Sequence, residues 1–544
     1  MTSPRATTVL IGQVVVSASP EGIRTAEAVG LADGRVIASG SRDGVLSESG
    51  PTASVLDFGT AAIVPGLCDF HLHLIGMARA RREVRLDDAQ DAGAIVAAMA
   101  DAAARLSMDG WLRGRGWHDA VLAATDRSRL EAAIGRRPAL VYSHDGHSAW
   151  ASPAALAAAG VSSATPDPAG GRIERDARGE PTGVLRERAA DILDPVAGGL
   201  TGTELQVALR ETLTELASLG ITSAVDAGDA TAEGGTGRYA ALGDRALILL
   251  QSDVLDGRLR LSANLPADAI GAAAEHGLRT GDPVAGRATM HIGWAKVFVD
   301  GALGSRTAAL FEPYTCGEAG DAGIARLSAE ELEAIVRAAR GADIGLAIHA
   351  IGDRGAAMVL DALTHEPRRT LSLAPDRMEH LQLLRPEDVP RLAAADITAS
   401  VQPVHCASDR ELVDRCWSDR AARAYPWRDL QRAGTRLAFG SDAPIESPNP
   451  WLGVFAALHR RFPGDGTDDW QPQQTLNFAA ALAGYTSGSA DAAGWPDRGH
   501  LRPGAHADLA VLDRSLDDLM RGSEDLADVR SQLTLLAGEE IHRA

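Results

Sequence analysis

The order of hydrophobic and polar positions divides the chain into parts with different rhythms. Residues 8–64 contain short apolar runs separated by turn residues such as those at 32–35, a spacing typical of strands in a small β domain. From about residue 200 to 442, stretches with helical periodicity alternate with short, continuous apolar runs. The tail from about residue 497 returns to short β segments. We therefore expect both ends of the chain to build one β domain beside a central α/β domain.

The alternating part predicts a parallel sheet closed into a barrel. Ser328 and Glu331 form a capping box that opens one predicted helix, and Gly220 and Gly341 are stop signals for two others. Because helices that alternate with apolar strands cover a parallel sheet, this many units favours a barrel. Helices are expected at 205–219, 328–341, 354–364, 386–394 and 428–433, and strands at 67–74, 221–226, 294–299, 344–349, 378–380, 397–401 and 436–442.

Residues from about 75 to 200 interrupt this cadence. A helix is expected at 92–106 and a strand at 139–142, whereas 160–183 is rich in Pro, Gly and Asp and is expected to be a loop. The segment is too long for a simple barrel connection, so we interpret it as an inserted cap that folds over the site. Trp117 and His118 could line a pocket there, although packing within the insertion is the simpler interpretation.

The predicted fold class is therefore α/β: a (β/α)8 TIM-like barrel with a small composite β-sandwich domain from both termini and an inserted cap region. The boundaries follow from the changes of rhythm. The composite domain is expected to comprise 1–64 and 491–544, and the barrel 65–490, with the cap at about 75–200.

Composition and charge narrow the classes of function. The contents of 45% hydrophobic and 23% charged residues are those of an ordinary soluble protein, no apolar run reaches the length of a membrane helix, and residues 1–5 lack a secretory layout. We expect a cytoplasmic protein. The formal net charge of −20 argues against nucleic acid or an anionic membrane as a partner, so a small-molecule substrate is the remaining expectation.

Without a Cys-x-x-Cys pair, the four cysteines indicate neither a zinc knuckle nor a disulfide framework.

The chain contains a single lysine, Lys296, among 53 Lys and Arg residues. It lies in the apolar strand-like run 294–299, where a buried lysine can lose its proton or bridge metal ions as a carbamate, which arginine cannot do. Alternatively, one lysine is present in this arginine-rich chain by chance and has no special role.

His71 and His73 lie in the predicted strand 67–74, and side chains two apart on a strand point the same way, about 6–7 Å apart. Two such imidazoles can bind a divalent metal ion, although hydrogen-bonded histidines at a polar strand end are the alternative. Later strands end in further potential ligands, and strand ends meet at one face of a barrel. These ligands are Lys296, His349, His380 and Asp442.

This set of residues resembles the amidohydrolase superfamily, and in particular the YtcJ-like branch of amidohydrolase family 3. The resemblance runs nearly from end to end. It is carried by residues 65–73, 145–148, 296–301, 305–310, 349–353, 379–380, 402–405, 440–444 and 503–508.

The resemblance implies that His71 and His73 bind the more buried ion, that His349 and His380 bind the other, and that carboxylated Lys296 bridges them. Asp442 would bind the first ion and handle the proton. The implied cofactors are one or two divalent metal ions per chain, with zinc expected, and the implied reaction is attack of metal-activated hydroxide on a non-peptide C–N bond in a small amide, N-acyl or N-formyl compound. A homodimer is a further expectation from the resemblance.

Two alternatives to an amidase remain open. The same centre could hydrolyse esters, carbamates or cyclic amides, or the chain could be a catalytically silent metal-binding or regulatory protein with this fold. Asp145, His147 and His405 are candidates for substrate contacts, with polar loop structure as the alternative. Asp300 and Arg306 are also substrate-binding candidates, although they could instead form a structural ion pair or hold the loop after the strand that carries Lys296.

Overall fold

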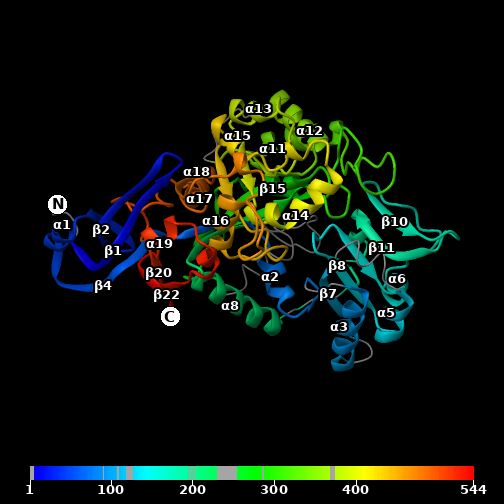
Figure 1. Cartoon of the computed structure of the whole chain (residues 1–544), viewed down its shortest axis with the longest axis horizontal. Coiled ribbons are helices and arrows are strands. Elements are labelled where there is room, and N and C mark those ends of the chain that lie inside the picture. Colours follow the sequence, from blue (N-terminus) through cyan, green and yellow to red (C-terminus); the bar gives the residue numbers. More distant parts are fainter. Residues whose placement is uncertain are drawn as a thin grey trace.

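Three β-sheets follow one another along the long axis of the molecule (Figure 1). A sheet built from both ends of the chain lies on one side of a central barrel, and a sheet built from the insertion lies on the other. The structure is a computed structural model. It describes residues 5–87, 89, 91–106, 110–117, 127–193, 195–197, 200, 202–228, 254–284, 287–367 and 374–544.

The central sheet has eight parallel strands, which confirm the predicted barrel, and a short ninth strand, β14 (Pro283–Val284), which pairs antiparallel with β15 (Arg287–Phe298). Its first and last strands meet where the Asp442 N–H donates to the His71 carbonyl at 2.6 Å and the His73 N–H donates to the Ala443 carbonyl at 2.8 Å. A Cβ at Gly440 would lie 2.4 Å from the His71 nitrogen, so glycine is required for this closure. In sheet order the strands are β5 (Leu67–Leu72), β12 (Ile221–Asp226), β13 (Arg260–Pro266), β15 (Arg287–Phe298), β16 (Leu346–Ala350), β17 (Arg377–His380), β18 (Thr398–Val401) and β19 (Leu437–Phe439).

Amphipathic helices cover the outside of the barrel. The capping box at Ser328 and Glu331 is present, and the helix that it opens ends at Ala342, one residue beyond the predicted stop. The helices of this part are α2 (Leu74–Ala80), α8 (Gly202–Ser218), α10 (Ile270–Glu275), α11 (Ala329–Ala342), α12 (Asp353–His365), α13 (Val389–Ala394), α14 (Pro403–Cys416), α15 (Trp427–Arg432), α16 (Pro450–His459), α17 (Phe478–Gly484) and α18 (Ser487–Ala492).

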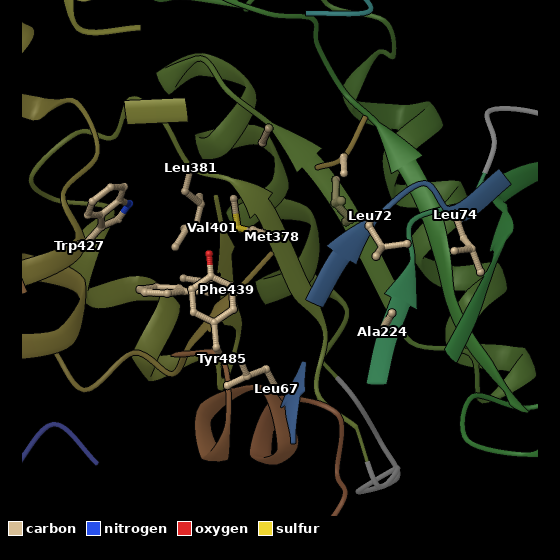
Figure 2. Close-up of a cluster of buried hydrophobic side chains, with 14 of the residues drawn as sticks. Leu67, Leu72, Leu74, Ala224, Met378, Leu381, Val401, Trp427, Phe439 and Tyr485 are labelled. Atoms are coloured by element: carbon tan, nitrogen blue, oxygen red, sulfur yellow. The ribbon is translucent and has the colours of Figure 1, made fainter. Parts of the chain in front are cut away.

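The barrel and its helices share one large hydrophobic core. Figure 2 shows the part of this core where Leu67, Phe439 and Tyr485 meet. The rings of Phe439 and Tyr485 pack edge to face at 5.5 Å, and the Cys68 N–H donates to the Tyr485 carbonyl at 2.8 Å. These contacts hold the start of β5 so that its other end carries His71 to the open face of the barrel.

The two ends of the chain form one seven-stranded sheet, as expected for a composite β domain. The link is the antiparallel pairing of Ile63 with Val511, which joins the N-terminal strands to the C-terminal ones. Two predicted strands, 8–11 and 13–16, are a single strand that is interrupted by a shift in register between Ile11 and Val14. In sheet order the strands are β22 (Glu539–Arg543), β21 (Ser531–Leu536), β20 (Leu509–Ser515), β4 (Ser49–Pro65), β1 (Ala6–Ser19), β2 (Gly22–Ala32) and β3 (Arg35–Gly40), with helices α1 (Arg42–Ser47) and α19 (Leu516–Met520) beside them.

The insertion is built around a six-stranded sheet with helix α3 (Ala92–Arg105) and helix α5 (Arg127–Ile134). The expectation of a loop at 160–183 was wrong in part, because two strands form there and Ile173 pairs with Leu185. In sheet order the strands are β10 (Gly171–Arg175), β11 (Pro181–Glu187), β9 (Ser148–Ala151), β8 (Ala139–Ser143), β7 (Leu112–Trp117) and β6 (Val84–Arg85); short helices α6 (Pro153–Ala158) and α7 (Arg188–Asp191) complete the region.

The spacing of the four cysteines indicated no disulfide framework, but two of them form a disulfide. Cys316, in the long connection after β15, forms a disulfide with Cys416 at the end of α14, and Cys68 and Cys406 are free and buried. The partners are 100 residues apart, so no local spacing could indicate the pair. In the part of the chain that the structure describes, no helix has both the length and the apolar character needed to cross a membrane.

Candidate metal centre

The ends of β5 and β19 bring three potential metal ligands together. His71 Nε2 and His73 Nε2 lie 3.3 and 3.2 Å from the same carboxylate oxygen, Oδ1 of Asp442. His71 is fully buried, and the two imidazole rings are 5.7 Å apart. This is slightly closer than the predicted 6–7 Å, because β5 ends at Leu72 and His73 is the N-cap residue of α2 rather than part of the strand. The structure therefore places the His-x-His pair and Asp442 around one point.

A second group of potential ligands adjoins the first and shares Asp442. Its other members are His380 and His405, and the potential ligand atoms of the three residues lie within 4.8 Å of one another. His349, predicted as the partner of His380, packs with its ring 4.5 Å from the His380 ring, and its Nε2 lies 3.2 Å from the Gly301 carbonyl. All four predicted histidines therefore lie at one face of the barrel, with His405 as a fifth.

Two of these ligands have backbone conformations that side-chain-bearing residues rarely adopt. His380 has φ 74° and Asp442 has φ 59°. Each such conformation costs roughly 1–3 kcal/mol and persists only where the surrounding structure imposes it. The two strained positions support a functional role for this face of the barrel.

Lys296 lies inside the same group. Its Nζ is 3.3 Å from His71 Nε2 and 4.8 Å from the centre of the Phe298 ring, and the residue is 2% exposed. Burial lowers the pKa of the Lys296 ammonium to about 8, which makes the neutral amine accessible near neutral pH.

Two polar side chains hold the imidazoles from behind. Glu379 Oε2 lies 2.6 Å from His71 Nδ1, and Gln402 Oε1 lies 2.8 Å from His380 Nδ1. Glu379 also forms an ion pair with Arg377, whose Nε lies 2.6 Å from Glu379 Oε1. Partners of this kind fix the ring orientation and leave Nε2 free to bind a metal ion.

The electrostatics of the group suit a divalent cation. Burial lowers the pKa values of His73, His349 and His380, which favours the neutral imidazoles that metal binding requires. Burial alone would raise the pKa of Asp442, but the neighbouring His71 and His405 outweigh it and hold that pKa well below its usual range. Neutral His73, His349 and His380 beside ionised Asp442 form a donor set that fits zinc or a similar ion. His405 differs, because burial would lower its pKa but the contacts with Asp442 and Glu446 raise it to about 10 and favour the protonated ring.

A cavity of about 300 Å³ opens over this centre. The barrel supplies His71, His73, Lys296, His349, His380 and Asp442, and the insertion supplies the opposite wall. Asp145 and His147 lie on that wall, where Asp145 accepts from Ser305 Oγ at 2.6 Å and His147 Nδ1 lies 3.0 Å from Glu187. The predicted substrate-contact residues Asp145 and His147 therefore face the cavity, and His405 contacts Asp442 Oδ2 at 3.2 Å.

Asp300 and Arg306 are placed differently. Asp300 is fully buried, and its carboxylate accepts the backbone N–H groups of Ala309 and Gly352 at 3.0 and 2.8 Å. Arg306 lines a neighbouring cavity beside α14. These contacts favour the loop-holding interpretation for Asp300, and the substrate-binding role of both residues stays a prediction.

Sequence reasoning did not assign several residues of the site. Glu379 and Gln402 belong to motifs that the sequence did single out, next to His380 and three residues before His405, so their position was a usable signal. Glu187, Arg115 and Arg326 had no local signal. Trp117 is buried, with its Nε1 donating to the Val141 carbonyl at 2.9 Å, which agrees with packing in the insertion. His118 lies outside the described residues.

Comparison with known proteins agrees with this geometry. The family model described as "Amidohydrolase family" matches residues 55–542. The chain is 31% identical to the putative amidohydrolase YtcJ of Bacillus subtilis, covering 92% of this chain and 93% of that one. It is 26% identical to N-substituted formamide deformylase of Arthrobacter pascens, covering 91% and 92%.

Among solved structures, an uncharacterized metal-dependent hydrolase from Pyrococcus horikoshii superimposes with a TM-score of 0.72 at 26% identity. This superposition covers 93% of this chain and 97% of that one. The family match spans the strands that carry every predicted ligand of the centre. The chain therefore belongs to the amidohydrolase family.

Proposed function

We propose that this protein is a metal-dependent hydrolase that cleaves a non-peptide C–N bond in a small amide, N-acyl or N-formyl compound. The observation that carries the proposal is the convergence of His71, His73 and Asp442 on one point beside buried Lys296. The names of the relatives support it, because one is a formamide deformylase and another is a metal-dependent hydrolase. The cavity of about 300 Å³ supports a small-molecule substrate.

The residues that would hold one or two divalent ions are His71, His73, His349, His380 and Asp442, and carboxylated Lys296 would be a further ligand. The bound ions would supply Lewis acidity, which lowers the pKa of a water molecule and polarises the carbonyl oxygen of the substrate. A carbamate at Lys296 would form by addition of carbon dioxide to the neutral Nζ with loss of one proton. The lowered pKa of Lys296 favours this reaction because only the neutral amine can add carbon dioxide.

Asp442 is the residue that moves the proton in this proposal. It is ionised, and its Oδ1 faces His71 and His73 while its Oδ2 lies 3.2 Å from His405 Nε2. It takes a proton from the attacking water and delivers it to the leaving nitrogen, a transfer that general acid–base catalysis requires from one positioned group. The wall formed by the insertion covers one side of the cavity that contains the reacting groups.

The proposal is tested by elemental analysis of the purified protein and of a Lys296→Arg variant, combined with turnover of matched amide and ester substrates. Arginine keeps the positive charge but cannot form the carbamate. One or two metal ions per chain and amide hydrolysis, both lost in the variant, would support the proposal. Hydrolysis of esters alone would favour an esterase, and bound metal without any turnover would favour a silent binding protein. Absence of metal after resupply would overturn the mechanism.

A cytoplasmic location and a homodimer remain predictions. The disulfide between Cys316 and Cys416 argues against a cytoplasmic location, because disulfides are uncommon in the cytosol of most organisms. Light scattering of the purified chain tests the second.

A further inference from the structure

One cationic side chain from the insertion reaches the cavity over the metal centre. Arg115 lies on β7 and is 8% exposed. It lines the same cavity as His71, Lys296 and Asp442, and it also lines an adjoining cavity beside Ile445. Arg115 therefore stands where two neighbouring cavities meet, on the wall opposite the barrel ligands.

The other charged side chains of this wall already have partners. Arg326 donates to Glu187 at 3.1 Å, and Glu187 also contacts His147. Glu83, which lies near Arg115, accepts from Arg113 Nε at 3.2 Å.

Asp87, the other nearby carboxylate, contacts His144 Nδ1 at 3.1 Å and Arg85 Nε at 3.4 Å. Across the ranges that the structure describes, the Arg115 guanidinium itself makes no hydrogen bond and no ion pair. It is therefore an unpaired cationic group in the wall of the cavity.

A buried guanidinium without a hydrogen-bonded partner is costly, because it has lost much of its hydration and is attracted to Glu83, Asp87 and Asp442 only from a distance. Burial lowers the pKa of Arg115, although the group stays protonated at neutral pH. The free-energy cost of burying this guanidinium is offset when a ligand with an anionic group pairs with it. The planar fork of donors on a guanidinium matches the two oxygens of a carboxylate.

We propose that Arg115 binds a carboxylate on the substrate, so that the preferred substrates are small amides that carry an anionic carboxylate in addition to the scissile bond. This inference rests on the proposed amide hydrolysis and specifies its substrate class. The cavity of about 300 Å³ restricts the carboxylate to a short distance from the scissile carbonyl.

The test compares substrates that differ only in the carboxylate. One series places it on the amine side: N-acetylglycine, N-acetyl-β-alanine and N-acetyl-γ-aminobutyrate, each against its primary amide. The other places it on the acyl side: malonamate and succinamate against malonamide and succinamide. In at least one pair we expect the wild-type kcat/KM to favour the carboxylate by roughly 10- to 100-fold, as charge-assisted hydrogen bonds allow, with most of the difference in KM.

Arg115→Met should reduce this preference to less than about 3-fold, and Arg115→Lys should retain part of it because lysine keeps the charge but not the fork. The matched control is Arg113→Met, two residues away on the same strand, where the guanidinium pairs with Glu83. That variant should keep the wild-type preference. A preference unchanged in Arg115→Met, or a wild-type preference for the neutral member of every pair, would overturn the inference.

Calorimetry with succinamate and N-acetyl-β-alanine separates this inference from the proposed reaction, because it needs no turnover. Carboxylate binding that Arg115→Met abolishes would support the site even if no amide is cleaved, and absence of carboxylate binding by the metal-loaded wild type would overturn it. The midpoint of thermal unfolding, Tm, tests whether Arg115 has a structural role instead. Removal of an unpaired charge should leave Tm unchanged or raise it, whereas a structural role would lower it.

Discussion

His71 is held in place by a carboxylate that lies behind it. Glu379 contacts His71 Nδ1 on one side and Arg377 on the other, and all three side chains are fully buried. The Arg377 guanidinium is stacked on Phe70 and Trp294, with its centre 4.7 and 4.4 Å from the two ring centres. The orientation of a predicted metal ligand therefore depends on a buried ion pair that does not itself face the cavity.

Glu379→Gln should weaken metal binding and destabilise the fold together. We expect metal affinity to fall by about 10- to 100-fold, because the amide holds the imidazole less firmly. The free energy of unfolding should fall by about 3–5 kcal/mol, because Arg377 keeps its charge without a carboxylate partner. Competition with a chelator measures the first effect, and urea unfolding followed by circular dichroism measures the second.

Glu387→Gln is the matched control, since Glu387 is largely exposed and pairs only at the surface with Arg385. It should change neither quantity. Equal metal affinity in Glu379→Gln and in the wild type would show that His71 does not depend on this carboxylate.

The residues of the site that were predictable are those at strand ends. His71, His380 and Asp442 were found because the carboxyl ends of parallel strands meet at one face whatever the details of packing. Glu379 was quoted only as a neighbour of His380, since its partner His71 is 308 positions away. Arg115 was missed for the same reason: its importance depends on which charges surround it in space.

At the level of elements, the connection after β15 is tied to α14. The Cys316–Cys416 disulfide joins them, the Thr315 N–H donates to the Cys416 carbonyl at 3.0 Å, and Thr315 Oγ1 donates to the Arg415 carbonyl at 2.8 Å. The first turn of α14 carries His405, which contacts Asp442. The disulfide therefore restrains a helix that contributes directly to the site.

We expect the unfolded, unreduced chain to show two reactive thiols, Cys68 and Cys406, and the reduced chain to show four. Reduction should lower the free energy of unfolding of the wild type by about 2–4 kcal/mol, because the cross-link restricts the unfolded chain. A Cys316→Ser, Cys416→Ser double variant should have the lower stability and should not respond to reductant. Four reactive thiols without reduction would contradict the disulfide.

Prediction of the elements succeeded where periodicity was strong. The helix predicted at 354–364 is found at Asp353–His365, because its apolar face repeats along the whole length. The strands β10 and β11 were missed, because Gly171–Arg175 is mostly half-buried or exposed and lacks a clear alternation of apolar and polar positions. On its other side β11 pairs with β9, a contact that the local sequence does not indicate.

For the whole molecule, a buried ion pair joins the barrel to the composite sheet. Arg260, at the start of β13, donates to both carboxylate oxygens of Asp508, at 2.6 and 3.0 Å, and Asp508 Oδ1 also accepts the Ala537 N–H at 2.7 Å. Arg260 is 4% exposed. Two parts of the chain that are far apart in sequence therefore depend on one carboxylate.

Asp508→Asn should lower the free energy of unfolding by roughly 3 kcal/mol, because it leaves a buried guanidinium without its anion. Urea unfolding should show a lower midpoint, whereas Asp517→Asn, at an exposed position on α19, should match the wild type. Equal midpoints for the two variants would show that the ion pair contributes no net stability.

Because β4 pairs with β20, the composite sheet cannot be completed during translation until β20 has been synthesised. Roughly 440 residues separate the two strands, so at about 5–20 residues per second β4 waits roughly 20–90 s for its neighbour to leave the ribosome. During that time one edge of β4 has unpaired peptide groups, and such an edge can pair with another nascent chain. Yield of this protein should therefore depend on chaperones that bind the N-terminal strands until synthesis ends.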